Sequence, residues 1–139
     1  MKLTIVGGGG FRVPLVHAAL LADDLIDEVV LFDTDPDRLA VIDRVLTAQS
    51  RPDTELRHRT STDPAEALAG ADFVFSAMRT GGTAGRVLDE RIAAQHGVIG
   101  QETVGAGGIS YALRSIPASL RLARTVAEVA PDAWLINFT

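Results

Sequence analysis

Residues 1–14, MKLTIVGGGGFRVP, decide the fold class of this chain. Leu3 to Val6 is a short apolar run that ends at four consecutive glycines, and a helix is expected from Pro14 to Leu21. The segment therefore predicts a strand, a tight turn and a helix. A glycine turn at a helix N-terminus is typical of a pyrophosphate-binding loop, because its backbone N–H groups can approach the phosphates.

The spacing of these glycines departs from the standard dinucleotide-binding motif, which has a third glycine three residues after the second. Arg12 or Val13 stands at that position, depending on where the count begins. The glycines alone would also fit a turn that merely connects two elements. Asp33 strengthens the nucleotide hypothesis, because an acid at the end of the second strand, Glu28 to Asp33, can accept hydrogen bonds from an adenosine ribose.

The rest of the chain alternates between expected strands and helices. Further strands are expected at Glu55 to Thr60, whose polarity suits a sheet edge, at Asp72 to Ala77 and at Ala133 to Phe138. Helices are expected from Asp35, a predicted N-cap, to about Ser50, from Asp63 to Gly70, from Arg86 to His96 with Gly97 as its stop, and from Ser110 to Val129, with a kink or restart at Pro117. Glycine-rich loops are expected from Arg79 to Gly85 and from Gly100 to Gly108.

This alternation predicts an α/β fold with a doubly wound parallel sheet, the Rossmann-type architecture of the NAD-binding domains of lactate and malate dehydrogenases. We expect residues 1–139 to form one such domain. The chain ends directly after its fifth strand, where the ligand crevice of such a sheet lies. We therefore expect this chain to be a truncated or partly observed part of a longer protein.

Composition argues against several classes of protein. The chain has 139 residues, 47% of them hydrophobic, a net charge of -5 and no cysteine. It is long enough to bury a core, lacks the basic excess of a nucleic-acid-binding protein, and offers neither a disulfide nor a thiolate metal ligand. No apolar run approaches the roughly 20 residues that cross a bilayer. We expect a cytoplasmic protein that binds no nucleic acid and no membrane.

The second half of the chain carries polar residues among glycines in a more specific pattern. Its segments are Arg79-Thr80-Gly81-Gly82, Arg86, Asp89-Glu90-Arg91, Gly100-Gln101-Glu102-Thr103, Gly105-Ala106-Gly107-Gly108 and Asp132-Ala133-Trp134-Leu135-Ile136-Asn137. In this order, together with the first glycine turn, they resemble glycoside hydrolase family 4 over the whole chain. The Gly-Gln-Glu-Thr element is the specific part. Three residues, Gly10, Phe11 and Arg12, differ from those that are common at these positions in the family. These differences affect only the cofactor loop.

The resemblance implies an NAD-dependent glycosidase, whose chemistry departs from that of the two-carboxylate glycosidases. NAD+ takes a hydride from C3 of the sugar, a divalent metal, typically Mn2+, polarises the new ketone, a tyrosine removes the C2 proton, and the aglycone leaves by elimination. Water then adds, and NADH returns the hydride. In the family the tyrosine and the cysteine and histidine metal ligands lie beyond this segment, so residues 1–139 alone should be inactive. The expected substrate is a phosphorylated glycoside, first of all a 6-phospho-β-glucoside, and the expected full-length protein is a homo-oligomer.

The expected cofactor-binding residues are Gly7, Gly8, Gly9, Gly10, Phe11, Arg12, Asp33 and Arg79, with closure of its own loop as the alternative role of Arg79. On the substrate side the resemblance points to Arg86, Glu102 and Asn137. Their structural alternatives are a salt bridge of Arg86 to Asp89 or Glu90, a hydrogen bond of Glu102 that fixes its loop, and a strand-end hydrogen bond of Asn137. We expect no catalytic residue and no metal ligand within this segment.

The histidines and the single tyrosine are expected to be structural. His17 should pack within a helix, and His58 should be exposed on a polar strand. His96 should lie at a helix end, and Tyr111 should pack at the start of the last helix.

Two other functions stay open at this point. An NAD-dependent 2-hydroxy-acid dehydrogenase of the lactate or malate type would share the fold, but would not be expected to carry the Gly-Gln-Glu-Thr element. A non-enzymatic nucleotide-sensing module would lack the downstream cysteine, histidine and tyrosine. The exact sugar, its anomer and its phosphorylation depend mostly on residues beyond Thr139.

Overall fold

The computed structural model describes residues 1–50, 54–101 and 103–138. The chain divides into two compact units. The first consists of Met1–Met78 and Ala123–Thr139 and contains the sheet, and the second is Arg79–Leu122.

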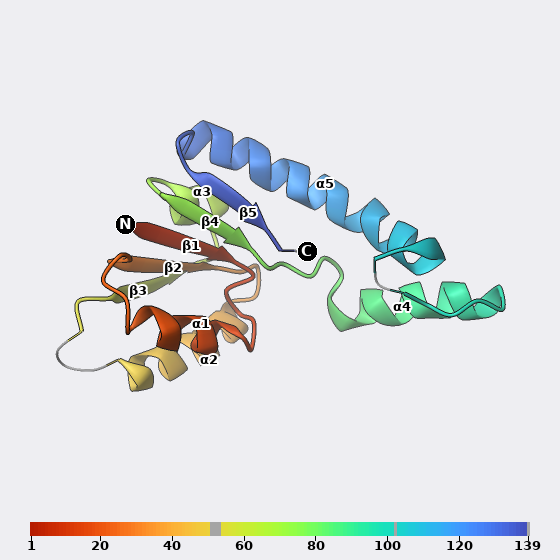
Figure 1. Ribbon diagram of the computed structural model, residues 1–139, viewed down its shortest axis with the longest axis horizontal. Coiled ribbons are helices and arrows are strands. Elements are labelled where there is room, and N and C mark those ends of the chain that lie inside the picture. The colour runs from red at the N-terminus through yellow and green to blue at the C-terminus, as the bar shows by residue number, and fades with distance from the viewer. Residues whose placement is uncertain (51–53, 102, 139) are drawn as a thin grey trace. The chain divides into compact units, whose positions relative to one another are not determined.

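The first unit is built on a five-stranded sheet in the order β3-β2-β1-β4-β5 (Figure 1). The strands are β1 (Lys2–Val6), β2 (Glu28–Phe32), β3 (Arg57–Ser61), β4 (Phe73–Ser76) and β5 (Trp134–Asn137), and each neighbouring pair is parallel. The register places Val6 opposite both Phe32 and Ser76, so the three central strands end level with one another. The predicted doubly wound parallel sheet is confirmed, and the polar strand β3 lies at an edge as expected.

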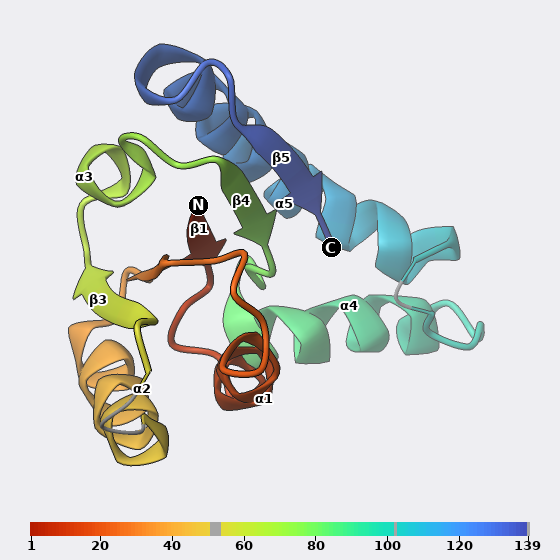
Figure 2. The ribbon, with the colours of Figure 1, turned by 60° about the vertical axis from the view of Figure 1, so that its left-hand side comes forward.

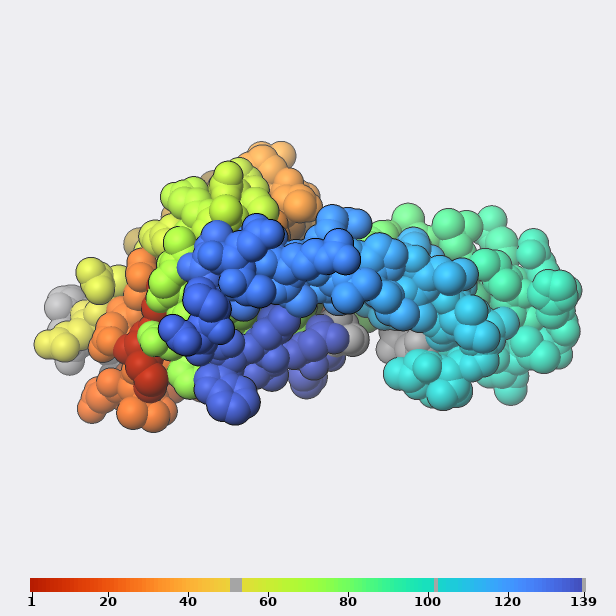
Figure 3. Space-filling model, turned by 90° about the horizontal axis from the view of Figure 1, so that it is seen from above, coloured from red at the N-terminus to blue at the C-terminus, as the bar shows by residue number. Residues whose placement is uncertain are grey.

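Helices cover both faces of this sheet. α1 (Val13–Leu20) and α2 (Pro36–Gln49) lie on one face, and α3 (Pro64–Leu68) and the end of α5 (Gly105–Val129) lie on the other (Figures 1 and 2). Side chains alternate between these faces along β1. Ile5 packs in the core cluster with residues of α1 and α2, whereas the Thr4 hydroxyl donates to the Ala67 carbonyl of α3 at 2.9 Å. Figure 3 looks onto the α3 face, with α3 in yellow-green and the end of α5 in blue.

Aspartates start α2 and α3. The Asp35 carboxylate accepts hydrogen bonds from the backbone N–H groups of Asp37 and Arg38, both at 3.1 Å, which confirms Asp35 as an N-cap. The Asp63 carboxylate accepts from the Glu66 N–H at 2.9 Å. A proline follows each cap at a position where the missing N–H costs nothing. The crossover helices α2 and α3 therefore begin at the positions that the sequence predicts.

The second unit contains α4 (Gly82–Gln95) and the first part of α5, and here two predicted boundaries are wrong. Gly82 to Gly85 belong to α4 rather than to a loop, and α5 begins at Gly105 rather than at Ser110. Glycine costs about 1 kcal/mol in a helix interior relative to alanine. A Cβ on Gly107, however, would lie 2.7 Å from the Gln101 carbonyl oxygen. Close packing within this unit therefore outweighs the low helix propensity of glycine.

The two helix features expected near Gly97 and Pro117 have different outcomes. α4 ends as predicted, with His96 as its C-cap and Gly97 following at a φ of 70°. α5, in contrast, is one helix through Pro117, so of the two expected alternatives, a kink or a restart, the restart is wrong. Pro117 cannot donate to the Leu113 carbonyl, but both residues are exposed, so water can hydrogen-bond that oxygen.

Two histidines lie together between α1 and β3, with His17 on the helix and His58 on the strand. His17 is fully buried, as predicted, but the expected exposure of His58 is wrong, because its side chain is 12% exposed and its ring lies edge-on to His17 with centroids 5.6 Å apart. His17 Nδ1 lies 3.3 Å from the Gln49 side-chain oxygen, and His58 Nε2 lies 3.4 Å from an Asp43 oxygen. Burial lowers the pKa of His17 and the neighbouring His58 adds to this effect, whereas the hydrogen bond to Gln49 opposes it.

The buried histidine predicts acid sensitivity of the first unit. Since the pKa of His17 is lowered in the folded state, the unfolded chain takes up this proton at a higher pH, and stability falls as the pH drops below about 6.5. We expect His17→Phe to remove this component, which contributes up to ~1.4 kcal/mol per pH unit to the slope of stability against pH. Urea unfolding, monitored by circular dichroism between pH 8 and pH 5, measures the slope of stability against pH for wild type and for His17→Phe. Leu20→Phe, a change in the same helix that keeps His17, should retain the wild-type slope; equal slopes for wild type and His17→Phe would contradict the assignment.

Candidate functional site

The turn after β1 is attached to the ends of both neighbouring strands. The N–H groups of Gly7 and Gly8 both donate to the Phe32 carbonyl of β2, at 2.9 and 2.8 Å, and the Ala77 N–H, just after β4, donates to the Val6 carbonyl at 2.8 Å. Gly7 has a φ of 93°, a conformation that favours glycine. Strand order reverses between β1 and β4, and such a switch point is where ligands bind in open α/β sheets. The turn is therefore a rigid element at the position of a ligand crevice.

Close packing accounts for glycine at three successive positions of this turn. A Cβ on Gly7 would lie 2.9 Å from the Ala77 carbonyl oxygen, one on Gly8 would lie 2.7 Å from Leu31 Cβ, and one on Gly9 would lie 2.7 Å from Arg38 Cβ. The fold itself thus requires a glycine at each of them. It also follows that the glycines are not by themselves evidence of a bound ligand.

The N-terminus of α1 differs from those of α2 and α3. Arg12, its N-cap, makes no capping hydrogen bond with its side chain, and the first turn contains no acidic residue. In contrast, α2 begins with Asp35 and Asp37, and α3 with Asp63 and Glu66. The partial positive charge of a helix N-terminus attracts anions when no carboxylate already neutralises it. Of the three helix starts, the one beside the glycine turn is thus the one suited to a phosphate.

Asp33 is joined to the glycine turn. Its half-buried carboxylate accepts one hydrogen bond from the Gly9 N–H at 3.0 Å and, on the other oxygen, one from the Asp35 N–H at 3.2 Å. The side chain is therefore held in one orientation and is not a freely solvated strand end. Each carboxylate oxygen can accept more than one hydrogen bond, so the group can still accept from a ligand hydroxyl.

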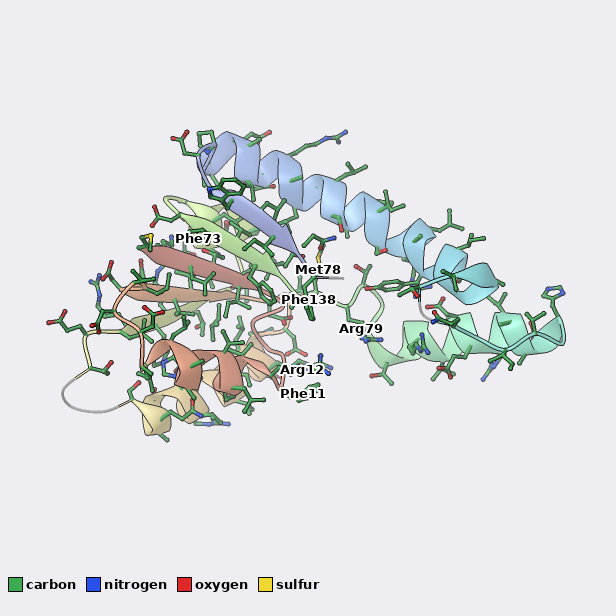
Figure 4. The ribbon with its side chains drawn as sticks, viewed as in Figure 1. Phe11, Arg12, Phe73, Met78, Arg79 and Phe138 are labelled. Carbon is green, nitrogen blue, oxygen red and sulfur yellow. The ribbon has the colours of Figure 1, made fainter. Side chains whose placement is uncertain are left out.

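Phe11 and Arg12 lie between the glycine turn and α1, and both are exposed (Figure 4). The Arg12 guanidinium carbon lies 5.2 Å from the centroid of the Phe11 ring, within the range of a cation–π contact. At the same end of the sheet, Phe138 follows β5 and its ring lies 5.5 Å from that of Phe75. Asn137, the last residue of β5, lies opposite Ser76 and is exposed. The first unit thus collects a cation, a carboxylate and aromatic rings at the carboxyl ends of its strands.

The second unit holds the remaining expected residues. Arg86 donates to the Glu90 carboxylate at 2.8 Å, so of its two possible salt-bridge partners the structure shows Glu90. Arg79 is exposed at the start of this unit. Glu102 lies outside the described residues. Whether Arg79, Arg86 and Asn137 contact ligands stays a prediction.

Sequence reasoning missed the partner of Asp89. This carboxylate is 2% exposed and accepts two hydrogen bonds from the Arg114 guanidinium, at 2.8 and 2.7 Å. The hydrogen bond from Arg114 lowers the pKa of Asp89 to about 2, although burial opposes the shift. Tyr111 packs near Arg114, with its ring centroid 5.8 Å from the guanidinium carbon. No local spacing in the sequence indicates this pair, because Asp89 and Arg114 lie 25 residues apart on different helices.

Within residues 1–50, 54–101 and 103–138, no three histidine or acidic side chains converge in a way that could hold a metal ion. In the same ranges, no helix combines the length and the apolar character that crossing a membrane requires.

Comparison with known proteins identifies relatives over the whole chain. The model of the family described as "Family 4 glycosyl hydrolase" matches residues 2–139. The maltose-6'-phosphate glucosidase of Bacillus subtilis is 39% identical over 99% of this chain, which corresponds to 32% of that enzyme. The chain thus spans about a third of the length of the curated relatives that it matches.

Solved structures agree with this match. A 6-phospho-β-glucosidase from Thermotoga maritima, solved with NAD and glucose-6-phosphate, superposes with a TM-score of 0.91 at 33% identity, over 100% of this chain and 34% of that one. A 6-phospho-α-glucosidase from gut microorganisms, solved with NAD and Mn2+, gives a TM-score of 0.85 at 36% identity, over 99% and 32%. Lactate dehydrogenase from Eimeria maxima gives 0.69 at 19% identity, which shows a common fold alone.

The carboxylate that joins the turn to β2 predicts a defined stability effect. Asp33→Ala removes the acceptor for the Gly9 and Asp35 N–H groups, and we expect it to destabilise the protein by about 1–3 kcal/mol. Asp24→Ala is the matched control, since it removes the same charge from an exposed position after α1 and should change stability by under about 0.5 kcal/mol. Chemical denaturation measures both variants. Equal stabilities for the two would show that Asp33 does not hold the turn.

Proposed function

Because the chain belongs to family 4 of the glycosyl hydrolases, we propose that it forms the NAD-binding part of a 6-phosphoglucosidase. The acid-free N-terminus of α1, directly after the glycine turn, is the observation that carries this proposal. The turn and this helix end bind the pyrophosphate, with Gly10 and the exposed Arg12 nearest to it, and Asp33 accepts from the adenosine ribose. The NAD in solved structures of two relatives supports this assignment.

The described residues are compatible with NAD, but no group of them could form a complete metal site. NAD supplies hydride transfer when bound. The chain's own part is to hold the dinucleotide at the carboxyl ends of β1 and β2, with the Asp33 carboxylate already oriented by the Gly9 and Asp35 N–H groups. Since no metal-binding cluster exists among the described residues, we propose that the ligands of a metal such as Mn2+ come from outside residues 1–139.

The substrate class is proposed from the relatives. Glucose-6-phosphate bound in the Thermotoga enzyme supports a phosphorylated glucoside. A 6-phospho-β-glucoside is the first candidate, and the 39% identity to a maltose-6'-phosphate glucosidase favours an α-linked substrate as the second. Arg86 and Asn137 are the proposed sugar contacts within the described residues, and Glu102 is proposed from its motif. A cytoplasmic location and homo-oligomeric assembly of the full-length protein also stay predictions.

The position of Asp33 predicts a preference for NAD over NADP. A 2'-phosphate would approach this carboxylate, so we expect full-length protein to bind NAD at least about tenfold more tightly than NADP. Asp33→Asn keeps one acceptor oxygen and removes the charge. It should reduce the ratio of the two affinities, because NAD should bind more weakly and NADP more tightly. Calorimetric titration of both cofactors measures the ratio, with Asp24→Asn as the charge-matched control. A wild-type preference for NADP would refute the role assigned to Asp33.

The proposed reaction predicts a cofactor requirement and an isotope label. Full-length protein should cleave a 6-phosphoglucoside only with both NAD+ and Mn2+, and residues 1–139 alone should cleave none. In heavy water the sugar product should carry deuterium at C2, because that proton is removed and replaced during elimination and water addition. Mass spectrometry and proton NMR of the product, with p-nitrophenyl 6-phospho-β- and α-glucosides offered separately, decide the reaction and the anomer. An unlabelled product, or full activity after both cofactors are stripped, would exclude this mechanism.

A further inference from the structure

The second unit contains a buried ion pair to which neither the motif pattern nor the proposed chemistry gives a role. Asp89 of α4 is 2% exposed, and Arg114 of α5 binds both of its oxygens, through Nη1 at 2.8 Å and Nη2 at 2.7 Å. Arg114 Nη1 also lies 3.4 Å from the Ser110 carbonyl oxygen of its own helix. A buried carboxylate is costly unless it is paired in good geometry, and a planar guanidinium bound through two nitrogens satisfies this condition. The pair therefore fixes the first part of α5 against α4.

Two glycines show that the same guanidinium also packs on the first turn of α4. A Cβ on Gly85 would lie 2.9 Å from Arg114 Nη2, and one on Gly81 would lie 3.0 Å from Arg114 Nε. Gly81 is the N-cap of α4 and has a φ of 86°. Two glycines of the segment 79–86 thus leave the space that the guanidinium occupies while it binds Asp89. The Arg114 side chain therefore lies directly against the backbone at the start of α4.

Arg86 follows directly after Gly85. Its guanidinium is held by Glu90 one turn later, at 2.7 to 2.8 Å, so the orientation of this first turn contributes to its direction. Asp89 lies between these residues on the same helix, next to Glu90 in sequence. A change in the contact between Arg114 and the glycines would therefore rotate or shift the backbone that carries Arg86.

We propose that Arg114 is a positioning residue for Arg86: by binding Asp89 and packing on Gly81 and Gly85, it holds the start of α4 in the orientation in which Arg86 meets the phosphorylated sugar. This inference rests on the proposed function. It makes Arg114 act through another residue, without contact to the substrate. Loss of the two-nitrogen geometry of Arg114 should then weaken sugar binding much more than NAD binding, since the proposed pyrophosphate and ribose contacts lie in the first unit and only Arg79 among the expected cofactor residues lies in the second.

The test is a double-mutant cycle in full-length protein loaded with NAD, with glucose 6-phosphate as the probe ligand. Arg114→Lys keeps the charge and removes the two-nitrogen geometry, and should raise the Kd for glucose 6-phosphate by about tenfold. In an Arg86→Ala background the same change should have less than about a twofold effect, because the residue that it positions is gone. In both backgrounds the Kd for NAD should stay within about twofold of its value without the change. Arg124→Lys, on an exposed position of the same helix, is the matched control and should alter neither Kd.

Gly85→Ala provides an independent variant in case Arg114→Lys fails to fold, as judged by circular dichroism and gel filtration. Its Cβ would displace the guanidinium from the first turn, and it should reproduce the weaker sugar binding with unchanged NAD affinity. Wild-type affinity for glucose 6-phosphate in either folded variant, or an effect of Arg114→Lys that adds fully to that of Arg86→Ala, would overturn the positioning role alone. Wild-type protein that binds no glucose 6-phosphate would overturn the proposed substrate class together with it.

Discussion

The first unit depends on one carbonyl group. The oxygen of Phe32, at the end of β2, accepts from the N–H groups of both Gly7 and Gly8, so the chain leaving β1 bends at once and stays against its neighbour. The Asp33 carboxylate extends the attachment by accepting from Gly9. Because β1 lies in the middle of the sheet, this attachment fixes where the chain leaves the sheet and where α1 begins. Glycine is required at these positions because the backbone has no room for a Cβ.

Electrostatics then distinguishes the helix beside this turn from α2 and α3, the other two helices that begin in the first unit. Aspartates satisfy the free N–H groups of α2 and α3, and the same carboxylates offset the positive ends of those helices. α1 has no such carboxylate, and the residue at its N-cap is an arginine. A helix end left in this state is less stable alone and more favourable to an anion. The contrast among the helix starts of the first unit therefore supports the proposed phosphate site more specifically than the glycines do, since packing already explains those glycines.

The second unit shows why a glycine-rich pattern is ambiguous. Gly81 and Gly85 lie under the guanidinium of Arg114, and Gly107 lies against the Gln101 carbonyl. In a sequence such glycines resemble those of a ligand-binding loop, because both uses demand the absence of a Cβ. Here two of the three lie inside helices, where their cost in helix propensity is offset by the close approach that they allow. A motif characteristic of family 4 thus includes residues that serve the packing of a buried charge.

The sequence by itself determined the strand–helix alternation, the edge position of β3 and the caps of α2, because short apolar runs, a polar strand and Asp-Pro pairs act locally. It also determined the family, through residues that occur in order from the glycine turn to Asn137. Only the tertiary structure decided that Asp89 pairs with Arg114, 25 residues away, and that His58 is covered by His17. It likewise decided that glycines at the starts of α4 and α5 are helical. The physical reason is that burial of a charge or a ring depends on which segments meet in space, and neither residue type nor local spacing specifies the partner.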